Sequence, residues 1–422
     1  MRKIIVLIIL FSLLLSSCVF SINIPVKPLP GKNATSTPTL VAANEEKDDP
    51  GESLPEDDPT HTPTTVPDMP TDTPTPVPLV INPLTGLPVD NPDCLNNPPA
   101  VISITNFPAS ARPQAGLDYA SIIFEAWIGE GDTRFLAIFY CDFPQENSID
   151  HSALVPHAAI GPIRSGRIWY EDIRELLNGF IIMASAWSGV SSNLSDYANI
   201  FGSDSGNINS AMIDVTKIEE ISKSVQNRLG KFSLEGNVFD ENPPDGGVPG
   251  ESVWIRYALL NQVLWRYRED SGAYHRFNND TQTGTTFTEA TDRLNSNPLT
   301  YENVIIMFAD HHALDVAYID IDFVGVTRPA LLFRDGRMYE IQWTTVNGEY
   351  EQQTGKRRPP RFIDKEGNPF PLKPGQTWVM VVPSYTRYYE TLDSENIIQM
   401  LNNETPGSGH WAVVFRAPVV QK

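Results

Sequence analysis

Residues 23–78 constrain the fold of this chain most, because they cannot contribute to a hydrophobic core. The stretch contains no Phe, Trp or Tyr, and prolines recur in Thr-Pro repeats such as TPTTVPDMPTDTPTPVP. Such a composition buries too little apolar surface to offset chain entropy, so we expect an extended, disordered tether over residues 19–78. Folded structure is therefore expected from residue 79 onward.

The first eighteen residues, MRKIIVLIILFSLLLSSC, have the layout of a secretory signal peptide, with two basic residues, an apolar run and small serines. The tetrad at residues 15–18, LSSC, resembles a bacterial lipobox, in which the cysteine receives a lipid. The alternative is a short anchor helix, but the run is shorter than the roughly 18 to 20 residues that span a bilayer. We predict a signal peptide over residues 1–18, a lipid on Cys18, and a location on the extracytoplasmic face of the cell membrane.

The overall charge limits the classes of partner. The formal net charge is −21, and proteins that bind nucleic acid nonspecifically need clustered Lys and Arg on a basic face. We therefore expect no nucleic-acid partner, and an anionic ligand only at a local basic site. With 422 residues, of which 41% are hydrophobic, the chain has material for two domains.

The pattern of predicted elements indicates an α+β protein. Strand-like segments and two helical patterns predict a mixed α/β first domain over residues 79–240, and one helix is predicted from Thr216, with Glu219 as its capping-box partner. The breaker-rich run FDENPPDGGVPGES is the predicted domain boundary. Beyond it the pattern predicts two hairpins, over residues 262–277 and over residues 331–343 with a turn at Asp335-Gly336. Alternating helices and parallel strands are absent from this pattern, so we expect a mainly antiparallel β second domain over residues 241–422.

Cys94 and Cys141 are the only cysteines besides Cys18. An oxidising compartment permits a disulfide between them, and two buried free thiols are the alternative. The bridge requires a Cα separation below roughly 7 Å, which the sequence does not report.

Arginines in Gly- or Pro-bearing loops form the main candidate site. The residues are Arg112 in SARPQAGL, Arg134 in GEGDTRF, and Arg164, Ser165 and Arg167 in GPIRSGR. A helix that begins near residues 165–168 would add its free N–H groups to the guanidinium groups, and the result would be a site for phosphate or carboxylate. The alternative is a set of structural ion pairs with Asp118, Glu125, Asp132 and Glu171.

Other catalytic patterns are missing from the sequence. Ser165 lacks the G-x-S-x-G context, and neither HExxH nor a Gly-rich nucleotide loop occurs, so we expect no metal site and no cofactor. His311 and His312 are interpreted as exposed loop residues. The basic run GKRRPPRF, residues 355–362, is interpreted as a solvated charged hairpin, with a second binding site as the alternative.

Several motifs together resemble the YerB-type lipoproteins, a bacterial family defined by a two-part domain of unknown function. The first half carries NPLTGLP (82–88), ARPQAGL (111–117), GDTRFLAIF (131–139) and GPIRSGR (161–167), and the second half carries FRDGR (333–337) and DKEGNPFPLKPGQTWVMVVP (364–383). The resemblance implies an envelope lipoprotein of two linked domains that associates with peptidoglycan synthesis. It implies no established chemistry.

We therefore expect a non-enzymatic, membrane-anchored accessory protein of cell-envelope assembly, which binds a cell-wall synthase or an anionic glycan through the arginines. Two alternatives remain open at this stage: an enzyme that acts on phosphate-linked envelope glycans, and a solute-binding lipoprotein. The sequence does not determine the oligomeric state.

Overall fold

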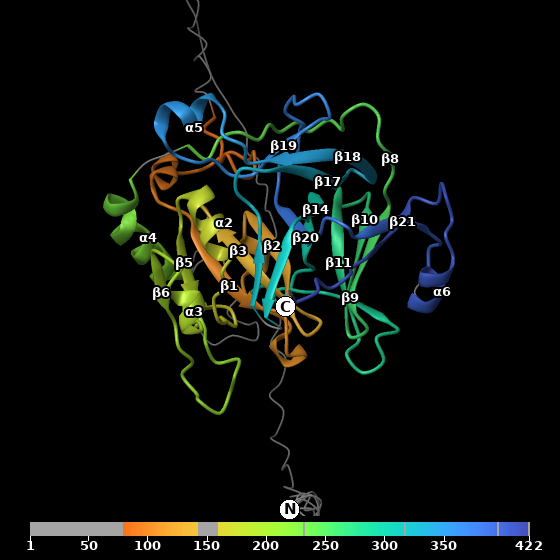
Figure 1. The fold of residues 1–422 in the computed structure, drawn as a ribbon, viewed down its shortest axis with the longest axis horizontal. Helices are drawn as coiled ribbons and strands as arrows, with labels where there is room; N and C mark the ends of the chain where they lie inside the picture. Colours follow the sequence, from red (N-terminus) through yellow and green to blue (C-terminus); the bar gives the residue numbers. More distant parts are fainter. Residues whose placement is uncertain (1–78, 142–158, 231–232, 316–317, 395, 421–422) are drawn as a thin grey trace, which may run out of the picture. The chain divides into compact units, whose positions relative to one another are not determined.

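The structure is a computed structural model that describes residues 79–141, 159–230, 233–315, 318–394 and 396–420. The predicted signal peptide, Cys18 and the tether lie outside the described residues. Residues Thr75–Lys422 form one compact unit. Within its described part, two large sheets contain most of the strands (Figure 1).

The larger sheet has eleven strands among the described residues. In spatial order they are β19 (Arg361–Ile363), β18 (Arg337–Thr344), β17 (Thr327–Arg334), β14 (Asn303–Ala309), β20 (Thr377–Pro383), β2 (Ile122–Gly129), β3 (Asp132–Phe139), β1 (Ala100–Thr105), β5 (Phe180–Met183) and β6 (Tyr197–Asn199), while β8 (Val248–Pro249) pairs with β18. Both faces of the central strands are covered, and β1, β2, β14 and β20 are buried at every position. Their continuous apolar runs are typical of strands that are buried on both faces.

Strand β20 joins the two predicted halves of the chain into this one sheet. It pairs in parallel with β2 from the first half and with β14 from the second. The residues before and after position 240 therefore share a sheet and a core. The prediction that the second half contains no parallel strands was wrong. Strands β14 and β20 pair in parallel, and so do β9 (Ser252–Ala258) and β22 (His410–Val414). Most other strand pairs in the second half are antiparallel, as predicted.

The smaller sheet has seven strands within the described residues. Its order is β12 (Phe287–Glu289), β11 (Ala273–Asn279), β10 (Asn261–Arg268), β9, β22 and β21 (Arg387–Thr391), with β13 (Thr300–Tyr301) also paired to β11. Two-stranded pieces join β15 (His311–Asp315) to β16 (Tyr318–Ile321) and β4 (Ala159–Ile160) to β7 (Ile213–Asp214). Both predicted hairpins form: β10 turns into β11, and β17 turns into β18 at Asp335-Gly336.

The described residues form five α-helices, of which only one is longer than eight residues. They are α2 (Tyr170–Leu177), α3 (Ser188–Ser191), α4 (Val215–Leu229), α5 (Glu349–Thr354) and α6 (Ile397–Asn402), and single-turn 3-10 helices cover Pro92–Asn96, Ala109–Ala111 and Leu117–Tyr119. The predicted capping box of α4 was wrong: Asp214 is the N-cap, and its side chain accepts hydrogen bonds from the N–H and the hydroxyl of Thr216. Gly230 ends the helix as expected.

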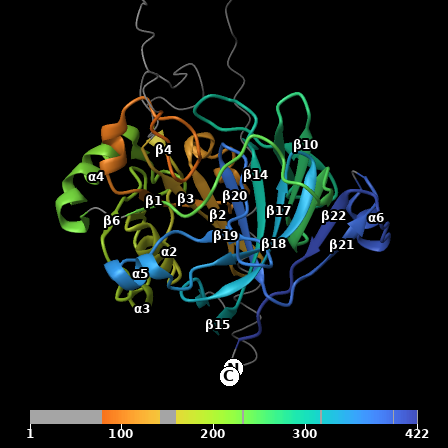
Figure 2. The ribbon, with the colours of Figure 1, turned by 90° about the horizontal axis from the view of Figure 1, so that it is seen from above.

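The elements form three layers. Figures 1 and 2 agree that α2 and α3 lie on one side of the larger sheet and that the smaller sheet lies on its other side. Between the sheets, Trp265 of β10 packs against Trp378 of β20, with ring centroids 5.3 Å apart, and Tyr301 packs against both rings. These aromatic side chains belong to one hydrophobic core that spans both halves of the chain.

An ion pair is buried at the same interface. The guanidinium of Arg276 lies 2.9 Å from Glu125, and their side chains are 1% and 0% exposed. Glu125 also accepts hydrogen bonds from Thr133 and from the indole of Trp378, whose ring lies under the guanidinium of Arg276. This pair connects β11 of the smaller sheet to β2 of the larger one.

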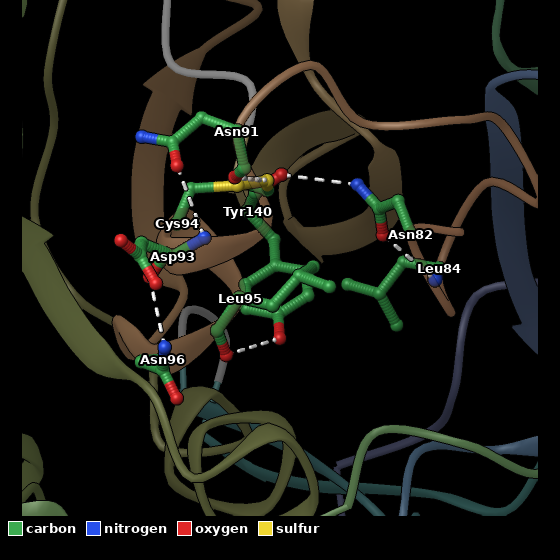
Figure 3. The surroundings of a disulfide bond; sticks show 9 residues. Asn82, Leu84, Asn91, Asp93, Cys94, Leu95, Asn96 and Tyr140 are labelled. Carbon is green, nitrogen blue, oxygen red and sulfur yellow. Dashed lines mark hydrogen bonds between the residues drawn. A yellow bond between two sulfur atoms is a disulfide. The ribbon is translucent and has the colours of Figure 1, made fainter. Parts of the chain in front are cut away.

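Cys94 and Cys141 are joined by a disulfide, with their Cα atoms 4.7 Å apart (Figure 3). Nearby, the hydroxyl of Tyr140 donates to the carbonyl of Leu95, and the side chain of Asn82 donates to the carbonyl of Tyr140. The bridge therefore ties the segment before β1 to the end of β3.

Candidate functional site

The segment GPIRSGR, residues 161–167, is extended rather than helical. The N–H of Arg164 donates to the carbonyl of Ser103 in β1, and the N–H of Gly166 donates to the carbonyl of Ser185 after β5. Gly166 leaves room for Met183 and Leu194, which a side chain at this position would displace. Helix α2 begins only at Tyr170, so the expected contribution of a helix N-terminus near residues 165–168 is absent.

Two arginines converge on one backbone carbonyl. Arg134 of β3 and Arg167 each donate an Nη1 hydrogen bond of 3.3 Å to the carbonyl oxygen of Ser165. The Ser103 hydroxyl also donates to this oxygen, and it lies 3.0 Å from the hydroxyl of the fully buried Tyr170. Among the described contacts, Ser165 therefore acts on the two arginines through its backbone carbonyl, which holds their guanidinium groups side by side.

Arg164 extends from the same segment toward the loop that precedes β7. Its guanidinium donates to the carbonyl of Ile208 and to the side chain of Asn209. Asn209 in turn donates to the hydroxyl of Ser110. We use the term arginine site for Arg134, Arg164 and Arg167 together.

The predicted alternative, a set of structural ion pairs, is not what the described residues form. None of the three arginines has a described carboxylate within 4.0 Å. The candidate partners are engaged elsewhere: Glu125 pairs with Arg276, Glu171 pairs with Arg174 at 2.7 Å, and Asp118 accepts from Asn295. Burial raises the pKa of the fourth candidate, Asp132, and the charge of Arg134 lowers it in part.

Positive charge in the arginine site is poorly compensated. Arg134 is 7% exposed, and burial together with the charges of Arg167 and Arg164 lowers its pKa to about 9. The Nε atoms of Arg134 and Arg167 are both buried and have no hydrogen-bond partner among the described residues. Buried charges in folded proteins are normally paired, so this arrangement favours an external anion.

A cavity of about 320 Å³ opens beside this site. Ser165, Arg167, Trp187 and Tyr318 line it, and the ring centroids of Trp187 and Tyr318 lie 5.5 Å apart. Trp187 is 65% exposed, which is unusual for so large an apolar side chain. Neither aromatic residue was predicted from the sequence. An aromatic residue in the loop SAWSGV after the apolar run of β5 was the available signal for Trp187, whereas Tyr318 is distant in sequence.

Arg112 does not join the other three arginines. Its Nε and Nη2 atoms donate to Asn106, which itself donates to Thr133. Successive side chains of a strand point to opposite faces, so Thr133, which Asn106 contacts, lies on the opposite face of β3 from Arg134. Arg112 therefore lies on the face of β3 that is turned toward the smaller sheet.

The second basic run is engaged in ion pairs. Arg358 and Arg361 lie 2.7 and 3.0 Å from Glu351 of α5, and Arg357 lies 2.7 Å from Glu175 of α2. Burial raises the pKa of Glu351, but the hydrogen bonds from Arg358 and from backbone N–H groups outweigh it and lower the pKa to about 2. These contacts hold α5 near α2 and indicate a structural role.

The histidine pair lies on a strand rather than in a loop. Both residues belong to β15, where His312 contacts Asp322 at 3.0 Å and burial lowers the pKa of His311 to about 4. Over the described ranges, no group of three or more His, Cys, Asp or Glu side chains is arranged to hold a metal ion. The helices of this part are also too short or too polar to span a membrane.

A Ser-His-Glu chain of hydrogen bonds occurs at the β10–β11 hairpin. His275 lies 2.9 Å from the hydroxyl of Ser271 and 2.7 Å from Glu289. The neighbouring N–H groups of Ser271 and Gly272 are used by Asp270 and by the carbonyl of Arg268, so they offer no oxyanion hole. We interpret these hydrogen bonds as structural: they stabilise the hairpin and hold the side chain of Glu289 in place.

The comparisons with known proteins agree with the motifs. Residues 84–223 match the "Protein of unknown function (DUF3048) N-terminal domain" and residues 253–379 match the C-terminal domain of the same family. A Bacillus subtilis (strain 168) protein described as "Putative lipoprotein YerB" is 30% identical over 322 residues, which cover 71% of this chain and 86% of that protein. The crystal structure of YerB protein from Bacillus subtilis matches with a TM-score of 0.55 at 25% identity, over 72% of this chain and 97% of that one. The chain therefore belongs to the YerB-like DUF3048 family of proteins of unknown function.

Proposed function

We propose that this protein is a membrane-anchored lipoprotein that binds an anionic glycan of the cell envelope at the arginine site and catalyses no reaction there. One observation carries the proposal: Arg134 and Arg167 converge on the carbonyl of Ser165, Arg164 follows from the same segment, and none of the three has a described carboxylate within 4.0 Å. Guanidinium groups recognise phosphate and carboxylate through parallel N–H donors, and Arg167 lines the cavity of about 320 Å³.

The cavity beside Arg167 supports the choice of a glycan. Its lining combines a guanidinium with the exposed ring of Trp187 and the ring of Tyr318. The electron-rich face of an aromatic ring attracts the C–H groups of a sugar, while the guanidinium takes a phosphate or carboxylate on the same ligand. A volume of about 320 Å³ lies at the small end of ligand cavities, which suits one or two sugar units.

The sequence supports the same location in the cell. The description of the Bacillus relative as a lipoprotein agrees with the lipobox at Cys18, and the long acidic tether after it would let the folded unit reach away from anionic lipid. The extracytoplasmic face and the role in peptidoglycan assembly belong to this proposal.

An enzyme acting on phosphate-linked glycans receives less support from the geometry. Such an enzyme needs a carboxylate among the converging arginines to act as acid, base or metal ligand. Among the described residues that line the cavity beside Arg167, Asp315 is the one carboxylate, so a second acid, base or metal ligand is missing there, and Arg112 lies on another face. Binding without catalysis is therefore the function that these residues support best.

Binding to isolated cell-wall sacculi tests the proposal. We expect the purified full-length chain to sediment with sacculi that retain phosphodiester-linked polymers, and to sediment much less after hydrofluoric acid has removed those polymers. Arg164→Lys and Arg167→Lys should each reduce binding, because lysine lacks the fork of donors, whereas Arg357→Lys on the paired basic run should not.

Three results would contradict the proposal. Equal sedimentation before and after acid treatment would exclude a phosphate-bearing glycan. Lysine variants that bind as well as the unchanged chain would exclude the arginine site. Recovery of a wall synthase by crosslinking, from cells whose sacculi do not bind the chain, would replace the glycan by a protein partner.

A further inference from the structure

A second cavity, of about 630 Å³, lies on the opposite face of β3 from the arginine site. Residues 109–114 of the first family half form one wall, and residues 278–291 of the second half form the other. The walls are joined by Arg293, whose side chain donates to the carbonyls of Pro113 and Ala111 and whose N–H donates to the carbonyl of Gln114. The cavity is therefore assembled by both halves of the family domain.

The cavity runs along the edge of strand β12. Among the described strands, β12 pairs only with β11 and ends the smaller sheet. Thr288, Glu289, Ala290 and Thr291 all line the cavity, although consecutive side chains of a strand point to opposite faces. Asn278 and Asn279 of the neighbouring β11 line the cavity as well, so it reaches from the edge of β12 over the adjoining part of the sheet.

The register shows which backbone groups point into this space. The N–H of Ala290 donates to the carbonyl of Arg276, and the N–H of Asp280 donates to the carbonyl of Thr286. In an antiparallel ladder, residue pairs that are hydrogen-bonded alternate with pairs that are not. Asn278 and Thr288 lie midway between these two contacts and therefore form a hydrogen-bonded pair. The backbone groups of Phe287 and Glu289 consequently point away from β11, along the open edge, where a further strand can pair with them.

Arg112 is the one cation among the described residues that line the cavity, beside the carboxylates of Asp280 and Glu289. The Nε and Nη2 atoms of Arg112 donate hydrogen bonds to Asn106. The guanidinium lies over the ring of Phe107 and has no described carboxylate within 4.0 Å. The two acidic residues of the lining are occupied: Asp280 accepts from the turn that follows it, and Glu289 accepts from His275 and Arg268. Burial and the charge of Arg276 lower the pKa of Arg112 to about 10, while the charges of Glu125 and Asp132 raise it in part.

The walls are rigid and polar. Both carboxylate oxygens of Asp280 are held by N–H and hydroxyl groups of Thr283 and Thr286, which fixes the loop before β12. Asn278 keeps a buried amide oxygen without a partner, which an N–H group of a ligand would satisfy. None of the described residues that line the cavity is aromatic, so a sugar finds no ring to stack on.

We propose that an extended peptide with a free C-terminal carboxylate binds in this groove, pairs with the open edge of β12 at Phe287 and Glu289, and places its carboxylate on Arg112. Strand addition explains the backbone groups along the edge, and carboxylate capture explains the unpaired guanidinium. The inference is independent of the glycan proposal, because it uses no residue of the arginine site.

Hydrogen exchange of the full-length chain tests this proposal. The probe is a pool of pentapeptides with randomised sequence and free C-terminal carboxylates, compared with the same pool as C-terminal amides. We expect the carboxylate pool to slow exchange in residues 286–291 by roughly tenfold when the concentration of free peptide exceeds its Kd about tenfold. Exchange in β21, the opposite edge of the same sheet, should not change.

Arg112→Gln provides the second arm. It should weaken the effect of the carboxylate pool by about tenfold or more, the value of a charge-assisted hydrogen bond, and leave the amide pool unaffected. Arg387→Gln on β21 is the matched control and should bind as the unchanged chain does. Should Arg112→Gln fold poorly, the comparison of the two pools on the unchanged chain still decides the question.

Each contrary result is specific. No protection of residues 286–291 by either pool would exclude strand addition at β12. Equal protection by the carboxylate and amide pools, or full carboxylate binding by Arg112→Gln, would exclude capture by Arg112. Protection of the two edge strands alike would show nonspecific pairing and would overturn the assigned site.

Discussion

Two groups of arginines in this molecule have opposite electrostatic surroundings. After α5, Arg357, Arg358 and Arg361 each contact a carboxylate, and two of them share Glu351. In the arginine site, the guanidinium groups contact backbone carbonyls and an amide side chain, and two Nε atoms remain unpaired. Paired arginines stabilise the fold, whereas unpaired ones are held by the fold at an electrostatic cost. The comparison teaches that charge compensation, rather than the number of arginines, separates the structural group from the candidate site.

The buried pair between the sheets should give the largest effect. Arg276→Met leaves Glu125 charged and buried, so we expect a loss of about 3 to 5 kcal/mol in the free energy of unfolding, measured by urea denaturation. The double variant Arg276→Met with Glu125→Gln should recover much of this loss. A single variant that unfolds like the unchanged chain would mean that pairing does not distinguish structural arginines here.

Removal of the shared carboxylate should give the next largest effect. Glu351→Gln takes the negative charge from Arg358 and Arg361, and we expect a loss of about 2 kcal/mol at neutral pH by urea denaturation.

The pH dependence of the same variant supplies its control. The folded pKa of Glu351, about 2, lies below the ordinary pKa of a glutamate, 4.5, so its contribution is complete above pH 4.5 and is lost as the pH falls toward 2. The difference between the variant and the unchanged chain should shrink over that window. A difference that stays constant down to pH 2 would contradict the assignment to this carboxylate.

Removal of the charge of Arg134 should not destabilise the fold, in contrast to removal of the charge of Glu351. Its folded pKa, about 9, lies below that of a free arginine, so the charged form destabilises the fold at every pH below that value. Arg134→Met keeps the volume of the buried stem and removes the charge, so we expect the free energy of unfolding to stay within about 1 kcal/mol or to rise. Binding to phosphate-bearing sacculi should be lost. Strong destabilisation would show that Arg134 belongs with the paired arginines.

The smallest effect on stability is expected for the two arginines of GPIRSGR. Arg164→Lys and Arg167→Lys should change the free energy of unfolding by about 0 to 1 kcal/mol, because neither has a described ion-pair partner. Binding should weaken while the melting temperature barely moves. If either variant instead melts several degrees lower and binds normally, the arginine site is a structural network and the glycan proposal fails.

Local elements of the fold could be predicted, because they depend on near neighbours in the sequence. The hairpin at Asp335-Gly336 forms where a short turn joins two alternating strands, and both turn residues have positive φ. The apolar face and the terminal glycine of α4 also predicted that helix. Its N-cap was assigned two residues too late, because Asp214 and Thr216 are both good capping residues and only the backbone angles decide between them.

The candidate site could be predicted only in part. GPIRSGR marked two of its arginines, since Gly and Pro around clustered basic residues indicate a functional loop. The separation of Arg112 from Arg134 depends on the face of β3 toward which each side chain turns, and this follows from strand pairing. The cavity beside Arg167 needs Trp187 and Tyr318, which are far apart in the chain.

The sequence by itself determined the family and the mainly β character of the second half, because each depends on composition or on residues close together in the chain. The lipid on Cys18 and the tether are predictions from the same kind of local pattern. Only the tertiary structure decided that β20 inserts between β2 and β14 and so gives the two halves one sheet. It also decided which arginines have carboxylate partners, since a pair such as Arg276 and Glu125 is separated by 151 residues and forms only when the two sheets pack. Charge compensation is a property of packed neighbours, and for this reason no local pattern reports it.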